Sequence, residues 1–151
     1  MTKKRVLIII VGIVIAVFGI WNAVWFWYYH SVKKYVVNIP DDGFGTYVIN
    51  DAAENSYSFK FPNYLQFMSN MALIDKDDNA LIVWTPFIGE KSYGVQICLE
   101  HREMYEMLLD KDGNLIPEKN LSDAPEVYNA NIDVIKQLYK DASDFWKDDF
   151  Y

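Results

Sequence analysis

Cysteine and histidine are nearly absent from this chain of 151 residues, which contains one cysteine and two histidines. The single Cys98 cannot form an intramolecular disulfide, which excludes a secreted mini-domain stapled by disulfides. Cys98 lies in an apolar run three residues before His101, but a nucleophilic site needs a third group, and no G-x-S-x-G, H-E-x-x-H or C-x-x-C motif accompanies the pair. We therefore interpret Cys98 as a small buried apolar residue, and we expect neither an enzyme nor a cofactor.

Basic residues are outnumbered by acidic residues after position 30. Only three of the 14 lysines and arginines precede residue 31, whereas all 21 aspartates and glutamates follow residue 30. Residues 31–151 therefore carry 11 positive and 21 negative charges, a net charge of −10. Proteins bind nucleic acid and anionic lipid headgroups by placing Lys and Arg against phosphate, so we expect no nucleic-acid partner.

One long apolar run stands at the N-terminus. From Val6 to Tyr29 the only clearly polar residue is Asn22. As a helix, this run would be about 36 Å long at about 1.5 Å per residue, which is enough to cross a bilayer. A single crossing must be helical, because every backbone polar group in lipid needs a partner within the segment.

The flanks of this run are typical of an anchor. Basic residues at positions 3–5 favour a cytoplasmic N-terminus, although Lys33 and Lys34 follow the run. The nearest candidate for signal-peptide cleavage, residues 21–23, has an indole where a small side chain is required, so we favour an uncleaved anchor over a cleaved signal peptide. The run ends in aromatic residues of the kind found at membrane interfaces: Trp21, Trp25, Trp27, Tyr28 and Tyr29.

Small residues in the same run predict a helix-pairing face. Gly12, Ala16, Gly19 and Ala23 are spaced by four, three and four residues, which places them on one side of a helix. Such faces allow two transmembrane helices to approach closely, and the neighbouring Asn22 would add an interhelical hydrogen bond. The alternative is the ordinary abundance of Gly and Ala in membrane helices.

Residues 35–151 contain several β-rich segments. Tyr57, Phe59 and Phe61 alternate with polar residues, as in a half-buried strand that Pro62 ends. Residues 89–92 predict a hairpin turn, as does the Asp-Gly pair at positions 112 and 113. The segments expected as strands are Tyr35–Ile39, Thr46–Ile49, Tyr57–Phe61, Leu81–Trp84, Tyr93–Leu99, Met104–Leu109 and Leu115–Ile116.

The C-terminal segment predicts one long amphipathic helix that begins after Asp123 and continues through Trp146. Asn131 falls at the centre of its apolar face, where a buried amide must bond a strand-end backbone group or mark a small polar cleft. Strands followed by a helix predict an α+β fold, with an antiparallel sheet of about five to seven strands packed by this helix. The domains expected are a transmembrane signal anchor at residues 1–30, a juxtamembrane connector at 31–34 and an extracytoplasmic α+β domain at 35–151.

Two acidic loops share the pattern D-x-D-x-N. Alternate oxygen ligands resemble the beginning of a calcium loop, but an EF-hand also needs Gly at position six and Glu at position twelve. Those positions are Ala80 and Pro86 in the first loop and Leu115 and Leu121 in the second, so we predict no metal site. The alternative is a hairpin turn in which Asp and Asn bond their own backbone. The candidate ligands are Asp75, Asp77, Asn79, Asp110, Asp112 and Asn114.

These patterns predict a single-pass protein of the plasma membrane, with its N-terminus inside and a binding or accessory domain outside the cytoplasm. Its partners would be the bilayer and, through the anchor helix, another membrane protein or a second copy. A bacterial envelope is indicated by the excess of Lys over Arg and by abundant Asn, Asp and Ile. Two alternatives stay open: an immunity-type inhibitor with an acidic surface, and an extracytoplasmic enzyme.

Overall fold

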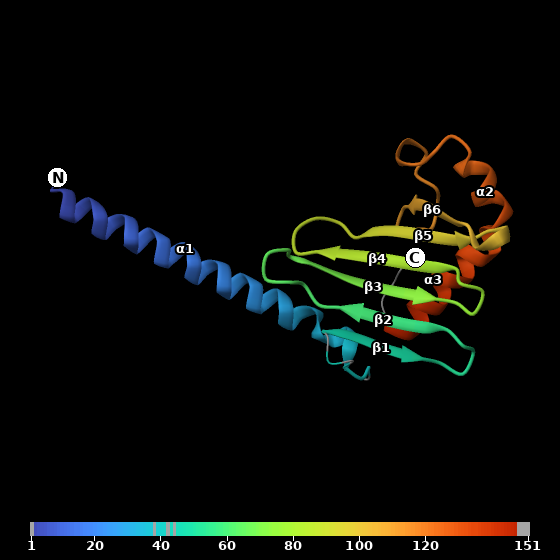
Figure 1. Cartoon of the computed structure of the whole chain (residues 1–151), viewed down its shortest axis with the longest axis horizontal. Coiled ribbons are helices and arrows are strands. Elements are labelled where there is room, and N and C mark those ends of the chain that lie inside the picture. Colours follow the sequence, from blue (N-terminus) through green and yellow to red (C-terminus); the bar gives the residue numbers. More distant parts are fainter. Residues whose placement is uncertain (1, 38, 42, 44, 148–151) are drawn as a thin grey trace. The chain divides into compact units, whose positions relative to one another are not determined.

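The computed structural model describes residues 2–37, 39–41, 43 and 45–147 (Figure 1). The chain forms two compact units, Met1–Lys34 and Tyr35–Tyr151. The first unit consists of helix α1, Lys3–Val32, and the beginning of a 3₁₀ helix. The second unit contains six strands and the C-terminal helices, which confirms the predicted α+β class with an antiparallel sheet.

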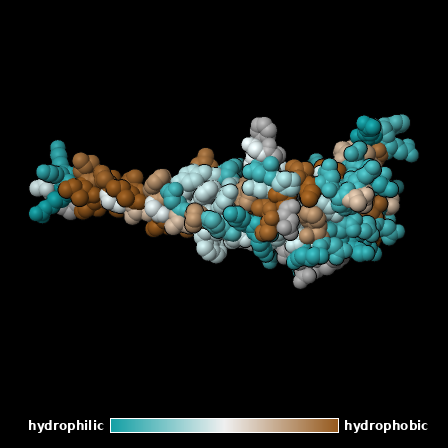
Figure 2. Space-filling model, turned by 90° about the horizontal axis from the view of Figure 1, so that it is seen from below, coloured by the Kyte–Doolittle hydropathy of each residue, from teal (hydrophilic) through white to brown (hydrophobic). Residues whose placement is uncertain are grey.

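Helix α1 is apolar around its whole circumference, as the run from Val6 to Tyr29 predicts. Its large side chains are exposed over Val6–Trp21, for example Ile15 at 66% and Ile20 at 65%, whereas Tyr28, at 4%, and Val32, at 3%, are buried. Figure 2 shows the exposed side chains as a nearly continuous hydrophobic surface. The helix is long and apolar enough to cross a membrane, a property that anchors share with signal sequences.

The predicted strand at Tyr35–Ile39 is wrong. A 3₁₀ helix, η1, occupies Lys33–Val36, and Asn38 lies outside the described residues. The difference is explained by the burial of two apolar residues that are three positions apart, which suits a 3₁₀ helix and not a strand. Val36 and Ile39 are each 6% exposed, and the Ile39 N–H donates to the Val36 carbonyl at 3.1 Å, whereas Val37 is 76% exposed. A strand would instead have placed Tyr35, Val37 and Ile39 on one face.

The sheet is an antiparallel meander in which each strand pairs with its neighbours in chain order. Most expected strands are present, but β3 was missed, and Leu115 forms only an isolated bridge with Leu109. Residues of β3 alternate in burial as a strand requires, yet the residues turned inward include Ser69, which hides the pattern. The strands are β1 Thr46–Asn50, β2 Ser56–Lys60, β3 Met68–Ile74, β4 Ala80–Pro86, β5 Ser92–Cys98 and β6 Met104–Leu109.

One face of the sheet carries the core. Alternate residues of the strands, such as Phe59, Leu73 and Leu81, are at most 1% exposed. Helix α3, Ile132–Trp146, lies across this face (Figure 1). Phe145 stacks on Tyr57 with ring centroids 3.9 Å apart, and Tyr139 on Tyr93 at 5.9 Å. Side chains on the opposite face, including Ser58, Gln96 and Glu106, remain accessible to solvent.

The expected single C-terminal helix is instead two helices separated at Asn131. Helix α2 is Ala124–Ala130, and α3 begins at Ile132. Asn131 has φ −119° and ψ 15°, and its side-chain Nδ2 donates to the Val127 carbonyl at 2.8 Å. Its own carbonyl accepts the N–H of Ile135 at 3.0 Å, which starts α3. The amide therefore bonds a helix carbonyl four residues earlier, and both expectations, a bond to a strand end and a small polar cleft, are wrong.

The outer edge of β6 is covered by the segment that follows it. Asn120 imitates a strand there. Its Oδ1 accepts the Leu108 N–H at 2.8 Å, while its Nδ2 donates to the Leu108 carbonyl at 2.8 Å and to the Ile116 carbonyl at 2.7 Å. Tyr105 adds a hydrogen bond from its hydroxyl to Asp123 at 2.5 Å. The N–H and carbonyl of Leu108, which could otherwise pair with an added strand, are thereby hydrogen-bonded.

Replacing Gly94 by Ala should destabilise the sheet, because Trp84 covers this glycine. An added Cβ would lie 2.8 Å from both Cη2 and Cζ3 of the Trp84 ring. We expect a loss of about 1–3 kcal/mol in the free energy of unfolding, as for other overpacked sites. Urea unfolding of the full-length protein in mild detergent measures it. In a Trp84→Ala background the cost should largely disappear, and an undiminished cost would contradict the explanation.

Candidate functional site

The residues predicted to interact with membranes all lie in α1. A Cβ added at Gly12 or Gly19 would meet no atom within 4 Å beyond the helix's own backbone, so there is space for a side chain at both positions. The Asn22 amide donates to the Phe18 carbonyl at 2.7 Å, a bond within the helix. The aromatic residues follow in the last turns, where the Trp25 and Tyr29 rings are 5.1 Å apart. Helix pairing and interface binding stay predictions.

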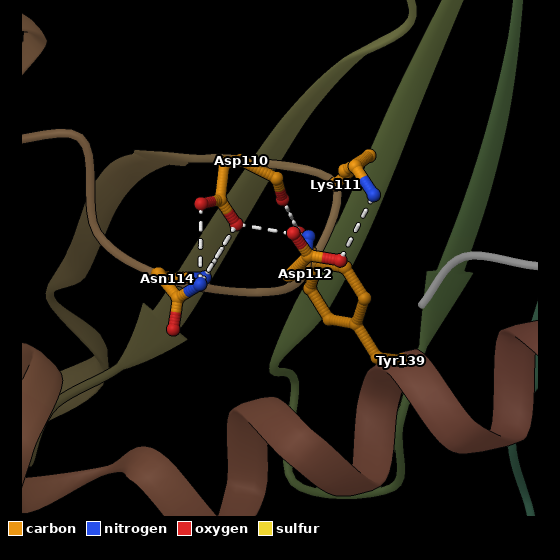
Figure 3. Close-up of polar contacts among 5 residues, drawn as sticks. All are labelled: Asp110, Lys111, Asp112, Asn114 and Tyr139. Atoms are coloured by element: carbon orange, nitrogen blue, oxygen red, sulfur yellow. Dashed lines mark hydrogen bonds and ion pairs between the residues drawn. The ribbon is translucent and has the colours of Figure 1, made fainter.

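The acidic loop Asp110–Asn114 is held by its own carboxylate (Figure 3). Oδ1 of Asp110 accepts the backbone N–H of Asp112 at 2.9 Å and that of Asn114 at 2.8 Å. Oδ2 accepts the Asn114 side-chain amide at 3.1 Å. Lys111 pairs with the carboxylate of Asp112 at 3.2 Å. Gly113 takes a positive φ of 77°, which closes the turn.

The loop Asp75–Asn79 has the same construction. Oδ1 of Asp75 accepts the N–H of Asp77 at 2.8 Å and of Asn79 at 2.9 Å, and Oδ2 accepts the Asn79 side chain at 3.0 Å. In both loops the first carboxylate is therefore directed at amides. Among the described residues, no group of three or more His, Cys, Asp or Glu side chains is placed to hold a metal ion.

A third loop of this kind, Asp51–Asn55, escaped the sequence analysis. Oδ1 of Asp51 accepts the N–H of Ala53 at 2.8 Å and of Asn55 at 2.9 Å. The pattern common to the three loops is D-x-x-x-N with a positive φ at the fourth residue, here Glu54 at 66°. Searching for Asp and Asn four residues apart would have found it, because the acidic residues between them are incidental.

Hydrogen bonds lower the pKa of the first aspartate in two of these loops. Bonding to the Asn55 backbone is the main reason that the pKa of Asp51 lies below its ordinary value. Burial acts against ionisation of Asp110, but bonds from Asn114 and Asp112 outweigh it and hold its pKa low. The bond to Asp123 raises the pKa of Tyr105 to about 12, so this phenol remains a neutral donor at physiological pH.

Two tyrosines connect the Asp110–Asn114 loop to the helices. The Tyr139 hydroxyl donates to the Asp110 carbonyl at 3.1 Å, and the Tyr128 hydroxyl donates to the Gly113 carbonyl at 2.9 Å. Burial raises the pKa of Tyr128, so it also stays protonated. The loop is thus a rigid joint between the sheet and the helices.

Cys98 is half-buried, so the expectation of a buried residue is wrong. The Cys98 thiol lies 3.8 Å from the Leu99 carbonyl, to which it donates. His101 is exposed and belongs to the short 3₁₀ helix η2, Glu100–Arg102, where it takes a φ of 62°. The two residues therefore occupy the reversal between β5 and β6.

The uncovered face of the sheet has a hollow that sequence reasoning did not find. Its volume is about 550 Å³. Trp84 lies over Gly94 at one side, and the Gln96 amide donates to the Glu106 carboxylate at 2.7 Å. Leu121, 70% exposed, stands at its rim. The hollow is also lined by Glu118 and Lys119, so its charged residues are two carboxylates and one ammonium. Together with the aromatic ring, this set suits a ligand with an apolar body and a positive charge.

Comparison with known proteins gives no relative: no family model, no curated protein and no solved structure matches the chain.

Replacing Asn79 by Ala should cost more stability than the same change at Asn114. The two residues occupy equivalent loop positions, but Asn79 is 7% exposed and its Oδ1 also accepts the Cys98 N–H at 3.0 Å. Loss of that buried acceptor should cost about 1–3 kcal/mol. Urea unfolding of both variants tests this, with Asn114→Ala as the matched control. Equal losses would show that the bond to β5 contributes nothing.

Proposed function

We propose that this chain is a single-pass membrane protein of a bacterial envelope, in which α1 is an uncleaved anchor and residues 35–151 form a binding domain outside the cytoplasm. The observation that carries the proposal is the apolar surface of α1. Its 18-residue apolar core is entirely unburied, and its length suits a bilayer. So large an exposed apolar surface is unfavourable in water and favourable in lipid.

The proposed orientation is supported by charge. Basic residues at positions 3–5 form the first turn of α1 and precede its apolar run, and no acidic residue occurs before Asp41. Cytoplasmic flanks are typically enriched in Lys and Arg. Aromatic residues at the other end of α1 suit the outer interface.

A binding role for the domain is supported by its uncovered sheet face. The hollow beside Trp84 and Glu106 offers an aromatic ring and a carboxylate on a rigid sheet. Gln96 fixes the carboxylate through its hydrogen bond. Such preorganised polar groups within an apolar surround are the usual features of a ligand site.

Cysteine labelling tests the anchor and its orientation. In a Cys98→Ala background, Lys111→Cys places a thiol on an exposed loop and Thr2→Cys places one before α1. In intact spheroplasts a membrane-impermeant maleimide should label Lys111→Cys, whereas Thr2→Cys should react only after permeabilisation. Mass spectrometry of the membrane-bound protein should find residues 1–30 still attached. A soluble product lacking them would establish a cleaved signal peptide instead.

Substitution within α1 tests association through the small-residue face. The double variant Gly12→Leu/Gly19→Leu should lose any membrane partner or second copy that copurifies with the tagged full-length protein in mild detergent, because leucines keep the backbones apart. The control, Val14→Leu/Val17→Leu, alters the opposite face and should retain it. Equal retention by both variants would refute a role for Gly12 and Gly19.

A further inference from the structure

Two loops at one end of the sheet expose large apolar side chains. The β2–β3 loop, residues 61–67, carries Leu65, which is 80% exposed, and the β4–β5 loop, residues 87–91, carries Ile88, which is 82% exposed. No large apolar side chain among the described residues is more exposed. Both loops leave the same end of the sheet (Figure 1). We call Tyr64, Leu65, Phe67, Phe87 and Ile88 the apolar loop pair.

The apolar loop pair is held in place rather than loosely displayed. The Phe87 N–H donates to the Phe67 carbonyl at 2.9 Å, and the two rings lie 5.7 Å apart. Within the β2–β3 loop, Asn63 Oδ1 accepts the N–H groups of Leu65 at 2.9 Å and Gln66 at 2.6 Å. The loop backbone is therefore paired locally, which leaves Leu65 directed outward at little further cost in conformational entropy on binding.

The five side chains of the pair are also uncharged. No Asp, Glu, Lys or Arg occurs in residues 61–74 or in residues 79–89, and Glu90 and Lys91, which complete the β4–β5 loop, carry opposite charges. By contrast, residues 35–151 carry nine positive and 21 negative charges, a net charge of −12. A surface of this composition suits the boundary between headgroups and acyl chains, where apolar side chains are buried and aromatic rings are favoured. The acidic remainder of the domain favours zwitterionic over anionic lipid.

The chain enters the domain at this same end. The Tyr35 ring stacks 5.7 Å from that of Phe59, one residue before the end of β2. Asp41 then bridges to Tyr47 at the start of β1, and β1 begins with Thr46 paired to Lys60. The residues that connect α1 to the domain are therefore adjacent to the strand ends from which the loops emerge.

That connection is short. Only residues 30–34 separate Tyr29, the last aromatic residue of the run, from Tyr35. Even a fully extended chain would span no more than about 20 Å over these six steps. If α1 is an anchor, the first residues of the domain must stay close to the headgroups.

We propose that the apolar loop pair inserts into the surface of the same bilayer that α1 crosses, so that the domain is held to the membrane by its loops as well as by its anchor. This rests on the proposed function, since without an anchor nothing brings the loops to lipid. Leu65 and Ile88 enter the acyl boundary, and Tyr64 lies at the headgroup level. The hollow beside Trp84 lies on a sheet face, not at the loop end, and stays accessible.

Fluorescence quenching in vesicles tests the proposal. Full-length protein in the Cys98→Ala background is labelled with a polarity-sensitive fluorophore at Leu65→Cys or Ile88→Cys and reconstituted in phosphatidylcholine vesicles. Leu121→Cys is the matched control, because Leu121 is also highly exposed but borders the hollow. Ile15→Cys reports on α1. Spin-labelled lipids serve as quenchers, with the label on the headgroup or deep in the acyl chain.

We expect headgroup-labelled lipid to quench positions 65 and 88 several-fold more strongly than position 121, and acyl-labelled lipid to quench position 15. Quenching at positions 65 and 88 no stronger than at 121, with position 15 quenched, would overturn loop insertion while leaving the anchor intact. It would also free the loop pair for a protein partner. An unquenched position 15 would overturn the anchor, and the loop proposal with it. Thermal unfolding by circular dichroism verifies that each labelled variant is folded.

Discussion

An Asp carboxylate that accepts two backbone N–H groups closes three reversals of this chain, and the meander depends on these closures. Asp51, Asp75 and Asp110 each bond the second and fourth residues that follow them. Because side chains in a strand alternate between faces, a slip of one residue at any hairpin would turn its core residues to solvent. The loops fix the register, and the register decides which residues form the core.

The two faces of the sheet consequently have different roles. One face is covered by α3, whose Tyr139 and Phe145 stack on tyrosines of the strands. The other carries both polar side chains and partly exposed apolar ones such as Leu108, and a hollow lies there beside the Trp84 ring above Gly94. The loops also differ in character. The loops around Phe67 and Phe87 expose apolar side chains, whereas the loop that begins at Asp110 is charged.

Local patterns in the sequence predicted most of the sheet and the N-terminal helix. Alternation in Tyr57-Ser-Phe59 and the Asp-Gly turn at positions 112 and 113 depend on neighbouring residues alone, and the structure contains the corresponding strand and reversal. Predictions were wrong where distant contacts decide. Val36 and Ile39 pack at a spacing of three against the domain, which overrides the β propensity of the segment. Ser69 faces inward because β3 lies between two other strands.

The candidate site was less predictable than the fold. The contacts that shape the hollow each join residues of two neighbouring strands. Trp84 covers Gly94, and Gln96 bonds Glu106, so neither contact can be recognised from a local sequence pattern. The acidic loops drew attention through their charge, yet their geometry follows from the Asp and Asn at their ends. The loop Asp51–Asn55 has that geometry although its sequence lacks the D-x-D motif.

Hydrogen bonding at one sheet edge limits how copies of the domain can assemble. Asn120 pairs with the N–H and carbonyl groups of Leu108 on the outer side of β6. A strand from a second copy that added there would first have to displace the Asn120 side chain. Edge-to-edge growth of the sheet into a fibre is therefore disfavoured at this end of β6.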